Sequence, residues 1–455
     1  MINRLVLLAL VPGAAAGAQD LRIAHVTVIS PERAGPRRDA TVSIHDGRIV
    51  ANVRTTNEID GHGLFLAPGL IDSHVHLNNV PDMTDEQEQQ YPAIARAARD
   101  QIPKSFLYAG FTTLIDLISV PAAMARWKSH DPVPDTYFCG GAAYKDGYPM
   151  NFFPKPQRYA MFPYAFTDDS SAVAAVARMK ADGAICVKTF FEHGFGPSHD
   201  LPVPTLSMVT SVVRAAHAAG LPVFLHASGT EAQRFGLAAG VDIMAHGLWH
   251  WNDAPDATAL TPSIRGLLDS VVRAHVGWQP TMQVLPGERD LFSASYLSNP
   301  LLVRFLPSSL IDWYRTAIGR DTTMTEEKAR AVYAGYIQRD EVATEYLAHH
   351  HARILFGTDT PSGQTYANPP GLNAWMEMQN LVDAGMTPAQ IFYAATLANA
   401  QAVHLDKDIG TVEVGKRANL LLLREDPSQT IRAYTGIVKV ILGGRVLDPR
   451  DLVAK

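Results

Sequence analysis

The chain has 455 residues, a formal net charge of -6 at pH 7, 47% hydrophobic residues and 18% charged residues. This balance is typical of a folded protein with a large core, and it excludes a disordered, collagen-like or coiled-coil chain. No basic excess points to nucleic acid as a partner, and two cysteines are too few for a disulfide scaffold.

The first residues have the features of an export signal. Arg4 precedes the short apolar run 5–11, and Ala16 and Ala18 form an A-x-A pattern before Gln19. The pattern predicts a signal peptide over residues 1–18 and a periplasmic or secreted protein; a frayed N-terminal strand is the alternative. No later apolar run reaches the length of a membrane span, so no membrane anchor is expected.

Both ends of the mature chain carry short strand patterns rich in apolar and β-branched residues. They cover residues 21–29, 41–44 and 48–53 at one end and 418–424 and 436–442 at the other. Because the middle of the chain has a different pattern, we expect the ends to pair into one small β-sandwich, formed by residues 19–66 and 408–455.

The middle of the chain, residues 67–407, alternates apolar runs with helical patterns. Strands are predicted at 69–77, 112–117, 136–140, 184–190, 223–227, 243–246, 277–281 and 354–358, and helices at 170–181, 206–219 and 230–239. Eight strands with helical crossovers predict an α/β fold, a (β/α)8 TIM barrel. A polar, aromatic interval at about 286–352, with helices expected at 326–338 and 340–349, reads as an insertion that forms a lid or wall near the barrel mouth.

The first chemical pattern is His74-Val75-His76 at the end of the first barrel strand. Residues i and i+2 of a strand face the same side, so both imidazoles can converge on one ion, whereas a helix would splay them. Two imidazoles suit zinc, iron, nickel or manganese. Alone, this short pattern is a weak signal.

Three further metal-type side chains stand at later strand ends: His226, His246 and Asp359. A barrel gathers the carboxyl ends of all its strands at one face, where active sites lie. Each histidine taken alone could be a hydrogen-bonded core residue. Taken together with His74 and His76, their recurrence at strand ends favours a metal site.

Lys188 interrupts the otherwise apolar strand 184–190. A buried lysine near cations must lose its charge, because desolvation and repulsion both lower its pKa. A neutral amine can take up carbon dioxide, and the resulting carbamate has two oxygens that can bridge two metals. The alternative is a lysine that extends to the barrel rim.

Five segments carry a resemblance to a known family, the metal-dependent amidohydrolase superfamily. They are 66–76 (LAPGLIDSHVH), 110–116 (GFTTLID), 357–359 (GTD), 394–400 (AATLANA) and 410–420 (GTVEVGKRANL). Within the superfamily the chain most resembles the branch of imidazolonepropionase-like proteins and binuclear X-Pro dipeptidases. The resemblance covers nearly the whole mature chain.

The resemblance implies a role for each metal-type residue. His74, His76 and Asp359 would hold one divalent ion, His226 and His246 a second, and Lys188 would bridge both as N6-carboxylysine; zinc is the favoured ion. Imidazolonepropionase proper uses one metal and lacks the bridging lysine, so Lys188 favours the binuclear group. A metal-activated hydroxide would then attack the substrate, with Asp359 as the proton-transferring catalytic residue.

The substrate is read less directly from the sequence. Dipeptidases of this branch often carry Gly-Gly-His after the third strand, but here Gly140-Gly141 is followed by alanine, which puts X-Pro dipeptidase activity in doubt. Aromatic and histidine side chains that follow strand ends are candidates for the substrate pocket, with simple packing as the alternative: Tyr144, Tyr148, His193, Trp249 and His250. Arg320 and Arg339 in the insertion are the candidates to bind a substrate carboxylate.

Cys139 and Cys186 are expected to be small buried hydrophobic residues, although export would permit a disulfide between them. The run 349–351, three histidines, is expected to be a solvated helix end rather than a metal site.

The sequence therefore predicts an exported binuclear amidohydrolase that cleaves an amide or peptide bond of a dipeptide or N-acyl amino acid. Ester, lactone or phosphoester hydrolysis on the same metals is the first alternative, and a non-catalytic binding protein on the same scaffold is a remote one. The expected partner is a small-molecule substrate, and a homo-oligomer is compatible with the sequence.

Overall fold

The computed structural model describes residues 20–455 except 78, 156, 196–199 and 363–364. The predicted signal peptide, residues 1–18, lies outside the described residues. Within these ranges, no helix has both the length and the apolar character that crossing a membrane requires.

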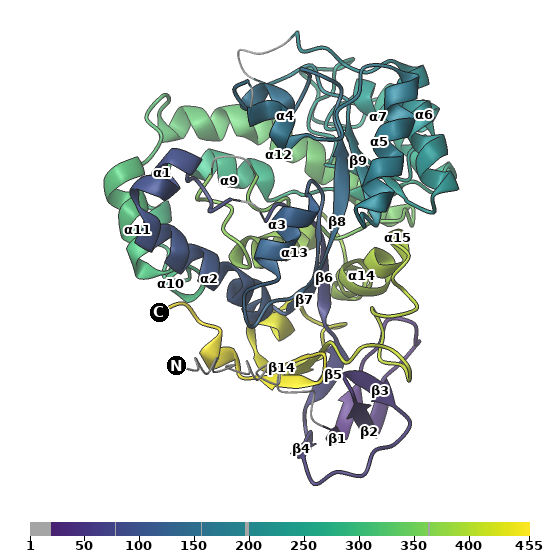
Figure 1. Ribbon diagram of the computed structural model, residues 1–455, viewed down its shortest axis with the longest axis vertical. Helices are drawn as coiled ribbons and strands as arrows, with labels where there is room; N and C mark the ends of the chain where they lie inside the picture. The colour runs from purple at the N-terminus through teal and green to yellow at the C-terminus, as the bar shows by residue number, and fades with distance from the viewer. Residues whose placement is uncertain (1–19, 78, 156, 196–199, 363–364) are drawn as a thin grey trace, which may run out of the picture.

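Strands from the two ends of the chain form one eight-stranded sheet, in which β13 runs antiparallel to β5. Figure 1 shows it at the lower end of the molecule, with the purple N-terminal strands beside the yellow C-terminal ones. Its strands are β1 (Leu21–Val28), β2 (Arg37–His45), β3 (Arg48–Val50), β4 (Glu58–Asp60), β5 (Phe65–Pro68), β13 (Leu420–Leu423), β14 (Ile437–Leu442) and β15 (Arg445–Leu447). Alternate apolar residues such as Ile23, Ile44 and Leu422 pack into one buried cluster, so both termini share one core.

The second sheet has seven strands, each parallel to and hydrogen-bonded with its neighbours in chain order. They are β6 (Leu70–Val75), β7 (Phe111–Asp116), β8 (Asp135–Ala142), β9 (Cys186–Phe190), β10 (Val223–His226), β11 (Ile243–Ala245) and β12 (Gly277–Gln279). Parallel strands need crossover connections. The helices that lie in the connections between consecutive strands include α2 (Pro92–Tyr108), α3 (Pro121–Trp127), α5 (Asp169–Ala181), α6 (Leu206–Ala218), α7 (Thr230–Ala239) and α8 (Pro262–Arg273). The expected α/β class is confirmed, and the parallel sheet has seven regular strands where eight were expected.

The expected eighth strand at 354–358 is not a regular strand, which corrects the sequence prediction. The chain here pairs with the two edges of the parallel sheet through isolated bridges, Trp278 with Ile354 and Val75 with Thr360, in place of a continuous ladder. Between these bridges Asp359 has a φ of 55°, in the left-handed region, which breaks the extended pairing. The ladder is therefore interrupted at the position where a candidate metal ligand lies.

The insertion is helical, as the sequence suggests. It contains α9 (Val284–Asp290), α10 (Leu302–Phe305), α11 (Ser308–Trp313) and α12 (Glu326–His349), and α12 packs against α9 (Figure 1). The two helices expected at 326–338 and 340–349 are one continuous helix, which begins after the N-cap Thr325. Its end carries the three exposed histidines of 349–351, as expected of a solvated helix end.

The remaining α-helices are short or lie towards the C-terminus. They are α1 (Asp85–Gln90), α4 (Gln157–Met161), α13 (Leu372–Asp383), α14 (Pro388–Tyr393) and α15 (Asn399–Ala402).

Cys139 and Cys186 form a disulfide, which corrects the expectation of two unpaired hydrophobic residues. Cys139 in β8 and Cys186 in β9 are register partners, and their Cα atoms are 4.4 Å apart. This separation is at the short end of the range that a disulfide can span. The bond therefore crosslinks two neighbouring strands of the parallel sheet, two residues before Lys188 in β9.

Candidate metal centre

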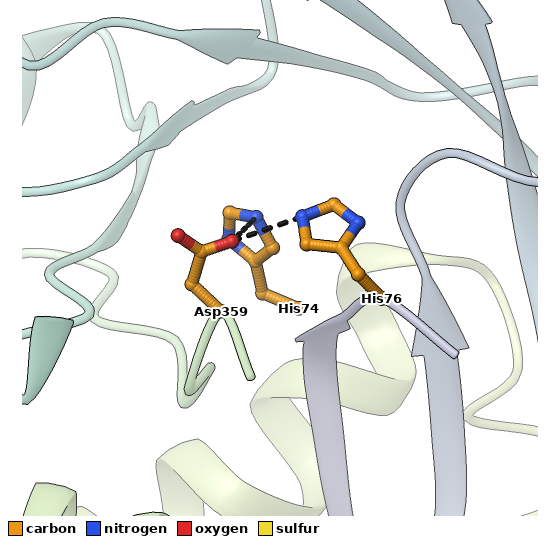
Figure 2. Close-up of side chains that lie close together, drawn as sticks. All are labelled: His74, His76 and Asp359. Carbon is orange, nitrogen blue, oxygen red and sulfur yellow. Dashed lines mark hydrogen bonds and ion pairs between the residues drawn. The ribbon is translucent and has the colours of Figure 1, made fainter. Parts of the chain in front are cut away.

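His74, His76 and Asp359 converge on one point (Figure 2). His74 lies near the end of β6, His76 directly follows this strand, and Asp359 lies in the irregular segment beside it. Oδ1 of Asp359 is 3.0 Å from Nε2 of His74 and 2.9 Å from Nε2 of His76. One ligand atom from each residue lies within 4.8 Å of the other two, a spacing that one cation can bridge.

His226 and His246 extend this group along the neighbouring strand ends. The His226 and His246 ring centroids are 4.4 Å apart, and the His246 ring is 4.9 Å from that of His74. Nδ1 of His246 is 4.0 Å from Oδ2 of Asp359. The structure thus brings all four sequence-predicted imidazoles and the carboxylate together.

Lys188 is buried beside the same imidazoles. Its side chain is 1% exposed, so the alternative of a lysine that extends to the rim is wrong. Burial lowers the pKa of Lys188 to about 7, although the charge of Asp359 acts in the opposite direction. In turn, the positive charge of Lys188 helps to lower the pKa values of His74, His226 and His246. A substantial fraction of the amine is therefore neutral at neutral pH, the form that can react with carbon dioxide.

Buried nitrogen atoms without a hydrogen-bond partner show that these residues fit a divalent cation. Among the described residues they include Nε2 of His226 and Nζ of Lys188. Buried polar atoms are rarely left unsatisfied in this way. Burial also lowers the pKa of His74 to about 3 and that of His246 well below its ordinary value. The imidazoles of His74 and His246 are therefore neutral, as metal ligands must be.

The sequence reading missed the polar residues that orient the candidate ligands. Oε1 of Gln279 lies 2.8 Å from Nδ1 of His74 and accepts a hydrogen bond from it, which leaves Nε2 to face a cation. Oγ1 of Thr281 lies 3.0 Å from Nδ1 of His246. A signal was present in the sequence, because Gln279 is a polar residue that ends a short apolar run, as the candidate ligands do.

Asp72 and Asn399 join β6 to the segment that carries Asp359. Oδ2 of Asp72 accepts a 2.6 Å hydrogen bond from the Thr358 hydroxyl, while Nδ2 of Asn399 donates to the carbonyls of Ile71 and Phe356, each at 2.8 Å. Burial raises the pKa of Asp72 to about 7. These bonds hold His74 and Asp359 in register although they are far apart in sequence.

Two candidate ligands adopt a backbone conformation that side-chain-bearing residues rarely have. The φ angle is 84° at His246 and 55° at Asp359. Such residues persist where surrounding bonds hold them, and here the His246 and Asp359 amides donate to the carbonyls of Gln279 and His74 at 2.9 and 2.7 Å. Backbone strain at both positions is typical of functional sites.

Two of the sequence-predicted substrate residues, Tyr148 and Trp249, contact candidate ligands, and a third, His250, follows Trp249 in the chain. The Tyr148 ring is 4.5 Å from that of His226, and the Trp249 ring is 5.1 Å from that of His246. His250 is 5.1 Å from Tyr336 of α12, so the insertion contacts this region.

The other two candidates have different surroundings. Tyr144 pairs with Phe166 through an isolated bridge and a ring contact of 6.0 Å. His193 is 45% exposed and lies 3.8 Å from the carboxylate of Glu231.

The two candidate arginines do not share one environment. The guanidinium of Arg339 donates to the backbone carbonyls of Ala257 and Pro255, so its donors already have protein acceptors. Arg320 is exposed.

Two acidic residues near the centre were not predicted from the sequence. Glu192 follows β9, and its Oε2 is 3.7 Å from Nε2 of His226. Burial alone would raise the pKa of Glu192, but the attraction of His226 holds it below its ordinary value. Glu288 of α9 is half-buried; desolvation raises its pKa to about 7, and the negative charge of Asp359 acts in the same direction.

Comparisons with known proteins relate part of the sequence to a family. Residues 322–447 match the model described as Amidohydrolase family. An imidazolonepropionase of Stenotrophomonas maltophilia (strain R551-3) is 40% identical over 86 residues, which is 16% of this chain and 21% of that protein. The chain thus matches about a fifth of the length of its curated relatives.

Solved structures are similar over most of the chain at low sequence identity, so they show the fold alone. A Xaa-Pro dipeptidase with methionine bound in its active site has a TM-score of 0.68 and 21% identity, covering 94% of this chain and 100% of that one. The A. niger ochratoxinase has a TM-score of 0.70 and 18% identity, covering 95% and 96%. The sequence and fold matches together confirm the resemblance to the metal-dependent amidohydrolase superfamily.

Proposed function

We propose that this protein is a binuclear metal-dependent amidohydrolase that cleaves an amide or peptide bond. One observation carries the proposal: four imidazoles, one carboxylate and one buried lysine lie together although they come from distant parts of the chain, and some of their nitrogen atoms are unsatisfied. His74, His76 and Asp359 would hold one cation, His226 and His246 the other, and carboxylated Lys188 would bridge them. When bound, the cations would lower the pKa of a water molecule and polarise the scissile carbonyl.

Asp359 is suited to accept and return a proton. Burial alone would raise its pKa, but the neighbouring imidazoles of His74, His76 and His246 hold its pKa well below the ordinary value. Asp359 is therefore ionised before it accepts a proton, and Oδ2 can do so while Oδ1 stays between His74 and His76. The same carboxyl group can then protonate the departing nitrogen.

Tyr148 is suited to orient the acyl group of a substrate. Burial raises its pKa well above the ordinary value, and the charges of Asp359, Glu192 and Glu288 act in the same direction. Its hydroxyl therefore stays protonated and can donate a hydrogen bond to a carbonyl oxygen beside His226.

We also propose that segment 353–360 closes the parallel sheet into a (β/α)8 barrel. The Trp278 amide donates to the carbonyl of Arg353 at 2.8 Å, and the His76 amide donates to that of Thr360 at 2.8 Å. The segment is thus bonded to both edges of the sheet.

The disulfide between Cys139 and Cys186 supports the predicted export of the protein, because disulfide bonds persist in oxidising compartments.

Turnover of a matched substrate panel tests the proposed reaction. Metal-loaded protein is assayed against dipeptides, N-acyl amino acids, lactones, aryl esters and phosphoesters, with chelator-treated protein as the control. We expect metal-dependent turnover of at least one amide substrate. Turnover confined to esters, lactones or phosphoesters would replace amide hydrolysis with the alternative reaction, and turnover that survives metal removal would contradict the metal mechanism.

A further inference from the structure

We propose that Glu192 is an additional ligand of the second cation, the one assigned to His226 and His246. This inference rests on the proposed binuclear centre and extends its ligand set by one carboxylate. Glu192 belongs neither to the ligands predicted from the sequence nor to the group of His74, His76 and Asp359.

Glu192 lies beside His226, slightly beyond hydrogen-bond distance. Its Oε2 is 3.7 Å from Nε2 of His226, which is too long for a hydrogen bond. Two atoms that each lie roughly 2.1 Å from one cation are separated by about this distance when the angle between them is wide. Nε2 of His226 is buried and has no hydrogen-bond partner.

The carboxylate is held in this position by the chain around it. Oε1 of Glu192 accepts a 3.0 Å hydrogen bond from the Gly194 amide, and Oε2 accepts one of 3.2 Å from the Ser228 hydroxyl. Among the described residues, the ion pair formed by Glu192 is the one with His226, and its side chain is 13% exposed. Each oxygen keeps a free lone pair, and the charge of the carboxylate has no lysine or arginine to neutralise it in an ion pair within the described chain.

Charge balance also favours this assignment. Two divalent cations carry more positive charge than Asp359 and a carbamate on Lys188 supply in negative charge. The histidine ligands are neutral when they bind a metal. A third anionic group beside His226 reduces the excess charge that the buried site would otherwise hold.

The test measures cation binding, so it needs no substrate. Metal-free wild-type protein and the variants Glu192→Gln and Glu231→Gln are titrated with Zn²⁺ in competition with a chromophoric chelator, and their Co²⁺ absorption spectra are compared. Glu231, which is 57% exposed and lies 3.8 Å from His193, provides the matched control. Thermal melting of the metal-free proteins verifies that each variant is folded.

We expect Glu192→Gln to bind the first cation normally and the second at least tenfold more weakly, with a changed Co²⁺ spectrum, while Glu231→Gln behaves like wild type. Two cations bound by Glu192→Gln with wild-type affinity would overturn the assignment, whether or not KM rises. A wild-type protein that binds a single cation would overturn both this inference and the proposed binuclear centre. Weakened second-cation binding in a protein that hydrolyses no amide would uphold Glu192 as a ligand and reject only the proposed reaction.

A structure of the wild-type protein with bound cations gives a result that no variant can obscure. Oε2 of Glu192 should lie about 2.0–2.2 Å from the second cation. A separation of more than about 3 Å, beyond any coordination bond, would overturn the assignment.

Discussion

Lys188 shows how a single buried side chain affects both stability and function. Its ammonium form is poorly solvated inside the sheet and is repelled by any protonated neighbouring imidazole, so the neutral form is favoured. The same burial that makes the amine reactive must destabilise the metal-free protein whenever the unfolded chain carries a charged lysine.

This cost should depend on pH in a defined way. The pKa of Lys188 is about 7 in the folded protein against a model value of 10.5, so the unfolded chain binds more protons between these limits. The penalty is therefore fully present below about pH 7 and disappears as the pH rises towards about 10.5. Lys188→Met should raise the free energy of unfolding of the metal-free protein by a few kcal/mol at pH 7, roughly 1.4 per pKa unit, and hardly at pH 10.

Urea denaturation of both metal-free proteins at pH 7 and pH 10 measures this difference. Lys180→Met, at an exposed position of α5, is the matched control and should not change the pH dependence. The same stability gain at both pH values would contradict the account of a charge penalty at Lys188.

Asp359 is the residue whose substitution should separate chemistry from folding. Asp359→Asn keeps the shape of the side chain, but an amide cannot accept the proton, so kcat should fall by about 10²–10⁴. Circular dichroism should be unchanged, and metal content is measured in the same samples because Asp359 is also a proposed ligand. A variant that turns over panel substrates at the wild-type rate would remove the proton-transfer role.

At the level of elements, the crosslink between β8 and β9 supports the strand that carries Lys188. Cys139 and Cys186 are 47 residues apart in sequence, so their bond restricts a sizeable loop of the unfolded chain. The double variant Cys139→Ser/Cys186→Ser should lose about 2–4 kcal/mol of stability, which a lower melting temperature would reveal. Wild-type protein in reductant should melt like the variant. Alkylation of two thiols in unreduced, unfolded protein would show that the bond does not form.

The contact between β6 and the segment before Asp359 requires a glycine at position 357, because there is no room for a side chain. A Cβ atom at Gly357 would lie 2.7 Å both from Cδ of Gln279 and from Cβ of His74. Gly357→Ala should therefore cost about 1–3 kcal/mol and weaken binding of the first cation, as measured by denaturation and chelator competition.

Gly335 provides the control for this substitution. It lies within α12 with open space around its Cβ position, so Gly335→Ala should be neutral or stabilise the helix by up to about 1 kcal/mol. Equal changes in stability and in cation binding for the two alanine variants would show that close packing around His74 does not restrict position 357.

On the scale of the whole molecule, the sequence predicted the elements whose signal is local. The period-two spacing of His74 and His76, and the positions of His226 and His246 at the ends of apolar runs, can be read without knowing the fold. The curled parallel sheet then brings these positions together. Lys188 could be recognised because a lysine in an apolar strand requires an explanation.

The features that were missed depend on partners far away in the sequence. Gln279 and Asn399 matter through hydrogen bonds to His74 and to the backbone beside it, and Glu192 through its distance to His226. Pairing of the two cysteines requires the register of β8 and β9, which composition does not reveal. The eighth strand was overestimated because its apolar pattern does not show the left-handed turn at Asp359.

Six side chains from distant parts of the chain are proposed to hold two cations at one end of the parallel sheet. Anomalous X-ray diffraction from crystals of the metal-loaded protein would test this arrangement. We predict two anomalous peaks about 3.5–4 Å apart, one at His74, His76 and Asp359 and one at His226 and His246, with a carbamate on Lys188 between them. A single peak with Lys188 as a free amine would contradict the account.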